Sequence, residues 1–154
     1  MRKILVTGTI LMATVLLVGI QESAAGNKGT LLVSANVLPK LSQTTLRQQT
    51  DLLVTQQDIA KGYVDIHAGT IIHISSNSQN GYFLNFYIDG QFIKATDVRI
   101  NGRTVSVQAG AGLIPQPFPG ISGETVEITY RLFLAPETTP GSYRWPITVA
   151  ASLM

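Results

Sequence analysis

Apolar and polar residues alternate over long stretches of this chain, and this period of two restricts the fold more than any other feature. Every second residue from Val126 to Leu134 is apolar, and the same alternation runs from Tyr143 to Ala151. Side chains of a β-strand point alternately to the two faces of its sheet, so the pattern predicts strands with one buried face. We expect these two strands to form a central antiparallel pair, with Trp145 as the largest side chain of the core.

Turn residues follow one another at short intervals in the rest of the chain, and no stretch has the 3.6-residue period of a helix. Short strands are predicted at 63–66, 71–74 and 82–88. The best hairpin is 98–105, because its Asn-Gly pair supplies the two positive φ angles of a type I′ turn. The Gly- and Pro-rich segment 109–122 is predicted to be a long loop. The pattern indicates an all-β fold, an antiparallel β-sandwich of about seven to nine strands.

The first residues have the features of an export signal. Two basic residues open the chain, Ile4–Ile20 is mainly apolar, and the small residues Ser23 and Ala25 fit the positions before a cleavage site. We therefore expect a signal peptide at 1–25 and a single β-sandwich domain at 26–154, exported to the periplasm, the cell surface or the medium. An uncleaved N-terminal anchor is the alternative.

Charge and cysteine content narrow the function classes. The chain has 11 Lys and Arg against 9 Asp and Glu, a formal net charge of +2, which gives no basic stripe for nucleic acid. It has no cysteine, so the exported domain must fold without disulfides and cannot be a cysteine-anchored lipoprotein. We expect no nucleic-acid partner, no cofactor and no stable membrane span once the signal is removed.

Three segments of the chain resemble those of small exported bacterial Ig-like domains. They are Leu32–Val37, Ser76–Tyr82 and Thr139–Val149. The nearest type is the pilin-like group that includes spore coat protein U domains and archaic chaperone–usher subunits. The resemblance implies an Ig-like sandwich and protein partners, either further copies of the chain or a chaperone and an usher. In that group a subunit receives one strand from its chaperone or from the next subunit.

The segment from Leu31 to Val37 is the candidate assembly strand. Leu31, Val33, Ala35 and Val37 alternate with polar residues or leucine, and Pro39 ends the run. The segment is predicted to pair as an ordinary first strand of its own sandwich or to extend into a neighbouring subunit. If the segment pairs within its own sandwich, assembly would use the sheet edge at Pro146 or the 109–122 loop.

Two further groups of residues are candidate partner contacts. Phe83 and Tyr87 lie with Asn85 on one face of the strand 82–88, where they could stack on a sugar ring or be covered by a loop. The 109–122 loop carries four apolar side chains that either fold over the core as a lid or contact a partner. These four are Leu113, Ile114, Phe118 and Ile121.

No arrangement of residues in the sequence indicates catalysis. Asp65 and His67 share a strand face but lack the third ligand that a metal site requires, and no nucleophile motif is present. We therefore assign no catalytic, cofactor or metal residues and predict a non-enzymatic protein. The leading hypothesis is an exported structural or interaction protein, a fimbria-like surface subunit or accessory. The alternative is a periplasmic or extracellular module that binds carbohydrate or protein.

Overall fold

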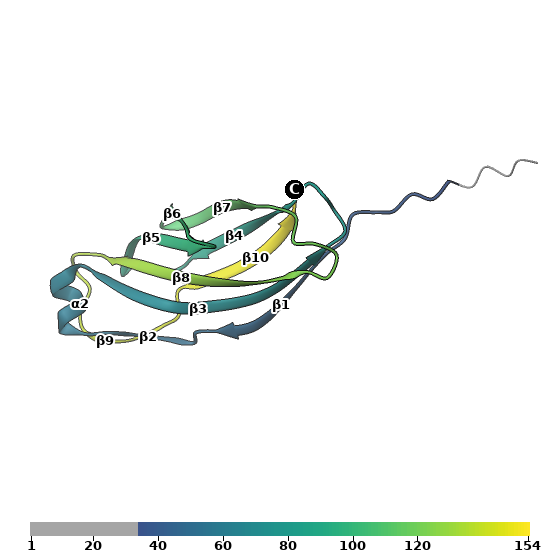
Figure 1. The fold of residues 1–154 in the computed structure, drawn as a ribbon. Helices are drawn as coiled ribbons and strands as arrows, with labels where there is room; N and C mark the ends of the chain where they lie inside the picture. Colours follow the sequence, from purple (N-terminus) through teal and green to yellow (C-terminus); the bar gives the residue numbers. More distant parts are fainter. Residues whose placement is uncertain (1–33) are drawn as a thin grey trace, which may run out of the picture. The chain divides into compact units, whose positions relative to one another are not determined.

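The expected all-β architecture is present in the structure, a computed structural model that describes residues 34–154. Residues 37–154 form one unit, which is described here by itself. The elements are β1 (Leu41–Gln48), β2 (Asp51–Val54), α2 (Gln56–Lys61), β3 (Tyr63–Ser76), β4 (Tyr82–Ile88), β5 (Ile93–Ile100), β6 (Arg103–Gln108), β7 (Gly110–Gln116), β8 (Glu124–Leu134), β9 (Gly141–Arg144) and β10 (Ile147–Leu153). The β-strands and their labels can be followed in Figure 1.

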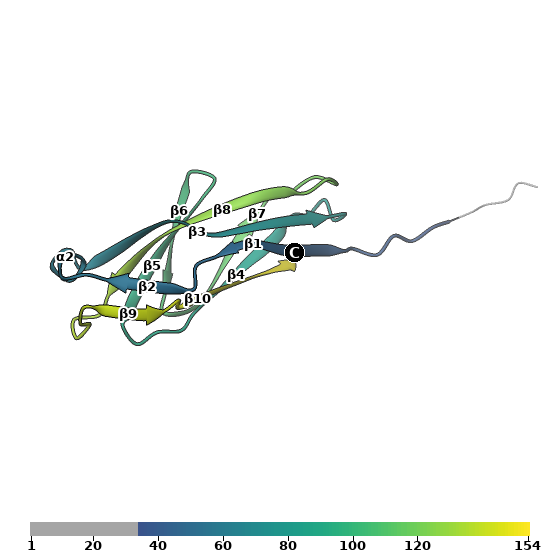
Figure 2. The same cartoon turned by 90° about the horizontal axis from the view of Figure 1, so that it is seen from below.

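Two antiparallel sheets form the two layers of the domain. One has the strand order β1-β3-β8-β5-β6, and the other has the order β10-β4-β7. A small ribbon of β2 and β9 extends the structure at the end that also carries α2 (Figure 2). Because every pair of neighbouring strands is antiparallel, each layer can bury one face and leave the other to solvent.

The core lies between the two layers and contains side chains from both. Phe86 of β4 meets Tyr130 of β8 in an edge-to-face contact with ring centroids 6.5 Å apart, and both side chains are fully buried. The Tyr130 hydroxyl donates a hydrogen bond of 2.8 Å to Thr70 Oγ1, so burial leaves it satisfied. Burial also raises the pKa of Tyr130. The apolar positions of the alternating strands β4 and β8 therefore face the core, as the sequence pattern predicts.

The two longest alternating segments are not neighbours in a sheet, so the prediction of a central pair is wrong. β8 pairs with β3 and β5, whereas β9 pairs with β2 and β10 with β4. Trp145 lies between β9 and β10 and is only partly buried, with its ring 5.4 Å from that of Tyr130. Pro146 is tolerated because it lies between β9 and β10, where no ladder requires its missing N–H. Its carbonyl accepts a hydrogen bond of 2.8 Å from the Asp89 amide.

Side-chain amides join the layers where β1 runs beside β10. The Ala151 amide donates to Gln43 Oε1 at 2.6 Å, and Gln43 Nε2 donates to the Val149 carbonyl at 3.1 Å. Gln48 Nε2 makes a longer bond of 3.4 Å to the carbonyl of Ile147. The Gln43 amide thus replaces the peptide group that a neighbouring strand would supply to β10.

The structure confirms one local prediction, the 98–105 hairpin, and differs from the sequence prediction at two other elements. The β5–β6 hairpin has the predicted turn, with φ of 49° at Asn101 and 78° at Gly102. The predicted strands 63–66 and 71–74 are a single strand, β3, with an irregularity between Ile66 and Thr70. A helix, α2, was not predicted, although a capping box in which Thr55 and the third helical residue bond reciprocally marks its start.

Half of the predicted 109–122 loop is the edge strand β7. Its residues pair with β4 from one end to the other, and Pro115 is tolerated because β7 has a partner on one side only. Gly112 lies against the Val107 side chain, where a Cβ atom would not fit. Gly112 and Pro115, which suggested a loop, are therefore compatible with an edge strand that passes close to β6.

The N-terminal strand predicted at 31–37 is not seen where the structure describes it. Residues 34–40 are exposed and belong to no strand, and the Val37 side chain is 75% exposed. Leu31 and Val33 lie outside the described residues, as does the predicted signal peptide. The first strand of the described domain is β1, which begins at Leu41. Pro39 lies just before it, where its missing N–H is not needed by a strand ladder.

Candidate functional site

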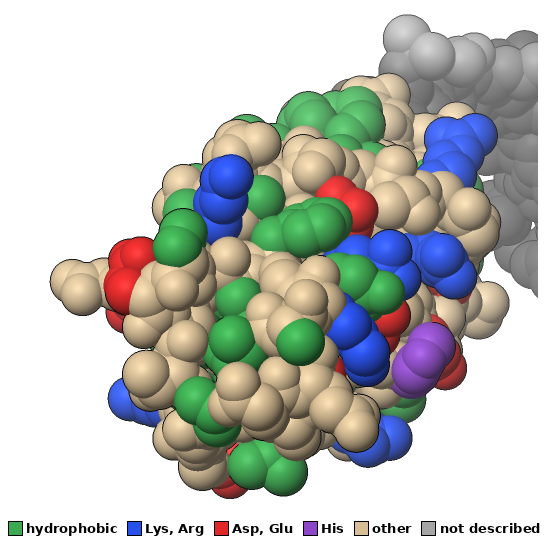
Figure 3. Space-filling view, turned by 90° about the vertical axis from the view of Figure 1, so that its left-hand side faces the viewer, with side chains coloured by type: hydrophobic (Ala, Val, Ile, Leu, Met, Phe, Trp, Pro, Cys, Tyr) green, Lys and Arg blue, Asp and Glu red, His purple; other side chains and the backbone are tan. Residues whose placement is uncertain are grey.

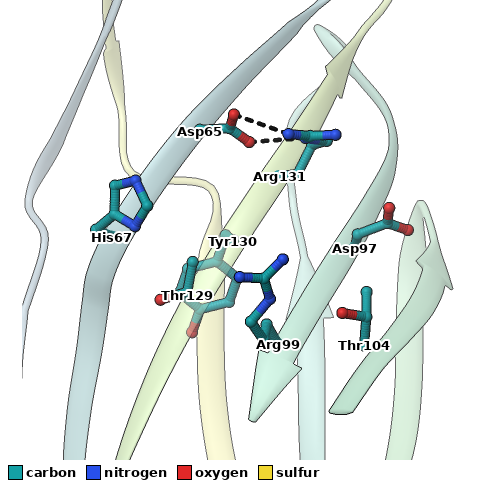
Figure 4. A pocket seen from close by; sticks show the side chains of 8 residues that line it. All are labelled: Asp65, His67, Asp97, Arg99, Thr104, Thr129, Tyr130 and Arg131. Carbon is teal, nitrogen blue, oxygen red and sulfur yellow. Dashed lines mark hydrogen bonds and ion pairs between the residues drawn. The ribbon is translucent and has the colours of Figure 1, made fainter. Parts of the chain in front are cut away.

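A pocket lined mainly by polar and charged side chains lies on the outer face of the five-stranded sheet and has a volume of about 180 Å³ (Figure 4). Asp65 of β3 accepts two hydrogen bonds from the Arg131 guanidinium on β8, at 2.7 and 2.9 Å. The same guanidinium lies 4.3 Å from the centre of the Tyr63 ring. The hydrogen bonds from Arg131 hold the pKa of the Asp65 carboxyl below its ordinary value, so this carboxylate is committed to its partner.

The other groups in this pocket do not form a catalytic arrangement. Asp97 accepts a hydrogen bond of 2.7 Å from the Ser106 hydroxyl. His67 is exposed on β3, and within residues 34–154 no hydroxyl group bonds to it. No group of three His, Cys, Asp or Glu side chains able to hold a metal ion occurs in the described part of the chain. The site can present charged groups on a surface, but it offers no activated nucleophile.

A larger opening lies between the edge strands β6 and β7, and we call it the β6–β7 groove. Its volume is about 550 Å³, and it is lined by Val98, Ile100, Asn101, Arg103, Val105, Ile114, Pro115, Gln116 and Pro117. Gly112 brings the two strands together at one end, against Val107. The groove therefore widens toward the β5–β6 turn, where the two layers separate.

The floor of the β6–β7 groove consists of core-facing side chains that the opposite sheet covers only in part. Val98 and Val105 are opposite each other in the β5–β6 ladder and point to the same face. Val98 is fully buried, but Val105 is 38% exposed, and Ile114 on β7 is 5% exposed. Each edge strand also pairs on one side only, which leaves backbone donors and acceptors available to another strand.

The outer face of the three-stranded sheet carries no charged side chain, and we call it the neutral face. The burial pattern and register place these residues on it: Phe83, Asn85 and Tyr87 of β4, Ala111, Leu113 and Pro115 of β7, and Thr148, Ala150 and Ser152 of β10. A hollow of about 220 Å³ on this face is lined in part by Asn85, Tyr87 and Leu113. Tyr87 is 53% exposed, so no loop among residues 34–154 covers it.

The candidate contacts fall into separate places. Phe83 is half-buried and Tyr87 exposed on the neutral face, which Leu113 joins from β7 with 62% of its surface exposed. Ile114 points the other way, into the β6–β7 groove. Phe118 is half-buried after β7, and Ile121 is 87% exposed in the turn before β8. Sequence reasoning did not find the groove, because no local pattern reveals that β6 and β7 are adjacent edges.

On the side that lies to the left in Figure 1, the surface carries both basic and acidic side chains (Figure 3). Among residues 34–154 no helix has the length and hydropathy needed to cross a membrane. No family model, curated protein or solved structure matches the chain. The groove and the two outer sheet faces are therefore the features of the domain that bear on its function.

Proposed function

We propose that the protein is an exported, non-enzymatic structural subunit that assembles with further copies of itself. The observation that carries this proposal is the β6–β7 groove, an apolar opening flanked by two unpaired strand edges. Export would depend on residues 1–25, and the sandwich would be of the Ig-like type suggested by the sequence resemblance. The protein would act at the periplasm or the cell surface, as a fimbria-like subunit or an accessory of one.

An added strand would satisfy both the backbone and the side chains of this groove. The free edges of β6 and β7 can accept a ladder of hydrogen bonds, and the exposed part of Val105 together with Ile114 can receive apolar side chains. Covering such surface gains about 25 cal/mol for each Å² of apolar area removed from water. Strand addition of this kind gives affinity through the main chain and specificity through alternate side chains.

The segment Leu31–Val37 has the composition that such a strand requires. Its apolar residues at every second position would enter the groove, and Ser34 and Asn36 would face solvent. In the described part of this segment, residues 34–37 are exposed and pair with no strand of the domain. The segment is therefore available to a partner without dismantling the core.

Chain length favours insertion of this segment into a second copy over insertion into its own groove. The linker from Val37 to the first residue of β1 can span at most about 14 Å. β1 and β6 are the two opposite edges of a five-stranded sheet, separated by four strand spacings or about 19 Å. Leu31–Val37 cannot lie beside β6 of the same domain while β1 keeps its place. Insertion into a neighbour, repeated from copy to copy, would produce a linear fibre.

A disulfide trap tests this arrangement directly, because the chain has no cysteine of its own. The double variant Val33→Cys with Val105→Cys should form disulfide-linked multimers under mild oxidation, seen as a ladder on a non-reducing gel. The matched control joins Val33→Cys to Leu53→Cys, at an exposed position of β2 outside the groove. Equal ladders from both variants, or a disulfide within a single chain, would contradict insertion into a second copy.

A further inference from the structure

The neutral face is a second feature of the surface, and of its residues only Pro115 also lines the β6–β7 groove. Its nine outward side chains come from three neighbouring strands and include no acid and no base. The outer face of the five-stranded sheet, in contrast, carries Asp65, Asp97, Arg99 and Arg131. An uncharged face of this kind disfavours ions and charged partners, since their desolvation would not be repaid.

An exposed aromatic ring and a hollow lie on this face toward the C-terminal end of its central strand, β4. Tyr87 borders the hollow of about 220 Å³, together with Leu113 of the adjacent strand. Tyr87 is 53% exposed and Leu113 is 62% exposed, so both offer apolar surface to a ligand. An aromatic body with a hydroxyl at its tip suits a ligand that has an apolar side and a polar rim.

Uncharged polar groups lie beside this apolar centre. Asn85 Nδ2 donates to the Ala150 carbonyl at 3.0 Å and to Ser152 Oγ at 3.1 Å, which uses both of its protons. These bonds fix the amide and leave Asn85 Oδ1 as an acceptor for a ligand. Thr148 is opposite Tyr87 in the β4–β10 ladder, and its side chain is exposed.

The size of the face selects among possible occupants. Three strands spaced about 4.8 Å apart and seven residues long cover about 300 Å². A specific protein–protein interface buries about 800 Å² on each partner, so this face alone is too small for a second copy. A ligand of one to three sugar rings fits the area, and its lack of charge matches the lining.

We propose that the neutral face binds a short neutral saccharide. One pyranose ring lies over Tyr87, with its apolar side against the Tyr87 ring and Leu113. Its hydroxyl groups donate to Asn85 Oδ1 and exchange hydrogen bonds with the Thr148 hydroxyl. Binding at this face leaves the β6–β7 groove free, so the two interactions are compatible.

The test is an NMR titration of the ¹⁵N-labelled protein with cellobiose, maltose, lactose and N,N′-diacetylchitobiose, and with sialyllactose as the charged comparison. We expect at least one neutral disaccharide to shift amide signals of β4 and β7 around Tyr87, with a Kd of about 0.1–10 mM. Tyr87→Ala should weaken this binding about tenfold, whereas Tyr87→Phe should largely keep it. Leu113→Asp should weaken binding, whereas Leu46→Asp on β1, at a similarly exposed position, should not.

Three outcomes would overturn the proposal. The first is that no neutral disaccharide shifts these signals at about 20 mM, a concentration above the expected Kd. The second is that Tyr87→Ala binds as tightly as the unchanged protein. The third is that the same signals shift with protein concentration when no sugar is present, which would show that a second copy covers the face. None of these results depends on whether the N-terminal segment enters the groove.

Discussion

Replacement of Gln43 tests how the two layers are joined along β10. Its amide accepts a hydrogen bond of 2.6 Å from the Ala151 amide and donates one of 3.1 Å to the Val149 carbonyl. A neutral hydrogen bond contributes about 1 kcal/mol net, and an unsatisfied backbone group left in a partly buried place costs somewhat more. Gln43→Ala should therefore reduce the free energy of unfolding by about 2–3 kcal/mol.

The acidic variant separates the two bonds of this amide. In Gln43→Glu the carboxylate can still accept from the Ala151 amide, but it faces the Val149 carbonyl without a proton to donate. The protonated form restores that donor, so the folded-state pKa of the new side chain should lie above its unfolded value of about 4.3. The destabilisation is then present at neutral pH and decreases as the pH falls through the folded-state pKa.

Urea unfolding followed by Trp145 fluorescence at pH 7 and pH 4 measures both effects. Gln48→Ala is the control, since both hydrogen bonds of its amide, to the Ile147 carbonyl and from the Thr70 hydroxyl, are 3.4 Å long and should together contribute less than about 1 kcal/mol. If Gln43→Ala were no less stable than Gln48→Ala, the two hydrogen bonds of the Gln43 amide would not stabilise the fold as stated. The same conclusion would follow if Gln43→Glu lost the same stability relative to the unchanged protein at both pH values.

Three further predictions concern the core, a turn and the charged pocket. Phe86→Ala should cost about 3–5 kcal/mol in urea unfolding because the side chain is fully buried, and Trp145→Ala should cost less because Trp145 is only partly buried. Gly102→Ala should cost about 1 kcal/mol, measured in the same way, since φ at this position is 78°. Arg131→Gln should raise the pKa of Asp65 toward its ordinary value in an NMR titration, and with it remove the stability that the ion pair supplies at neutral pH and loses as the pH falls through the lowered pKa.

Features that depend on residues close together in the chain, such as turns and buried strand faces, could be predicted from the sequence. The Asn101-Gly102 turn is present because these two residues tolerate positive φ, and the alternating strands bury the expected faces. The capping box between Thr55 and Asp58, followed by Gly62, was an equally local signal for α2 that the strand pattern obscured. Asp58 keeps a lowered pKa because the Thr55 hydroxyl donates to it.

What depends on distant contacts could not be predicted in this way. Alternation indicates which face of a strand is buried but not which strand lies beside it, so β8 and β9 were wrongly paired. Gly112 suggested a loop because its reason, the close approach of the Val107 side chain, is a tertiary contact. The β6–β7 groove exists only because two edges from different layers diverge. Tyr87 was a candidate from its phase in the strand, but its exposure depended on whether a loop covered β4.

Sedimentation velocity of the protein that begins at Gly26, the predicted mature N-terminus, measures self-assembly directly. The protein with residues 26–37 should form larger species as its concentration rises, and a variant that begins at Leu38 should remain monomeric. The shorter variant should stay folded, because every core side chain of the described structure lies at Leu52 or beyond. Adding a peptide of residues 29–37 should occupy the groove of the shorter variant and raise its urea midpoint. If the protein that begins at Gly26 is strictly monomeric at high concentration, or if the shorter variant assembles equally well, the N-terminal segment does not drive assembly.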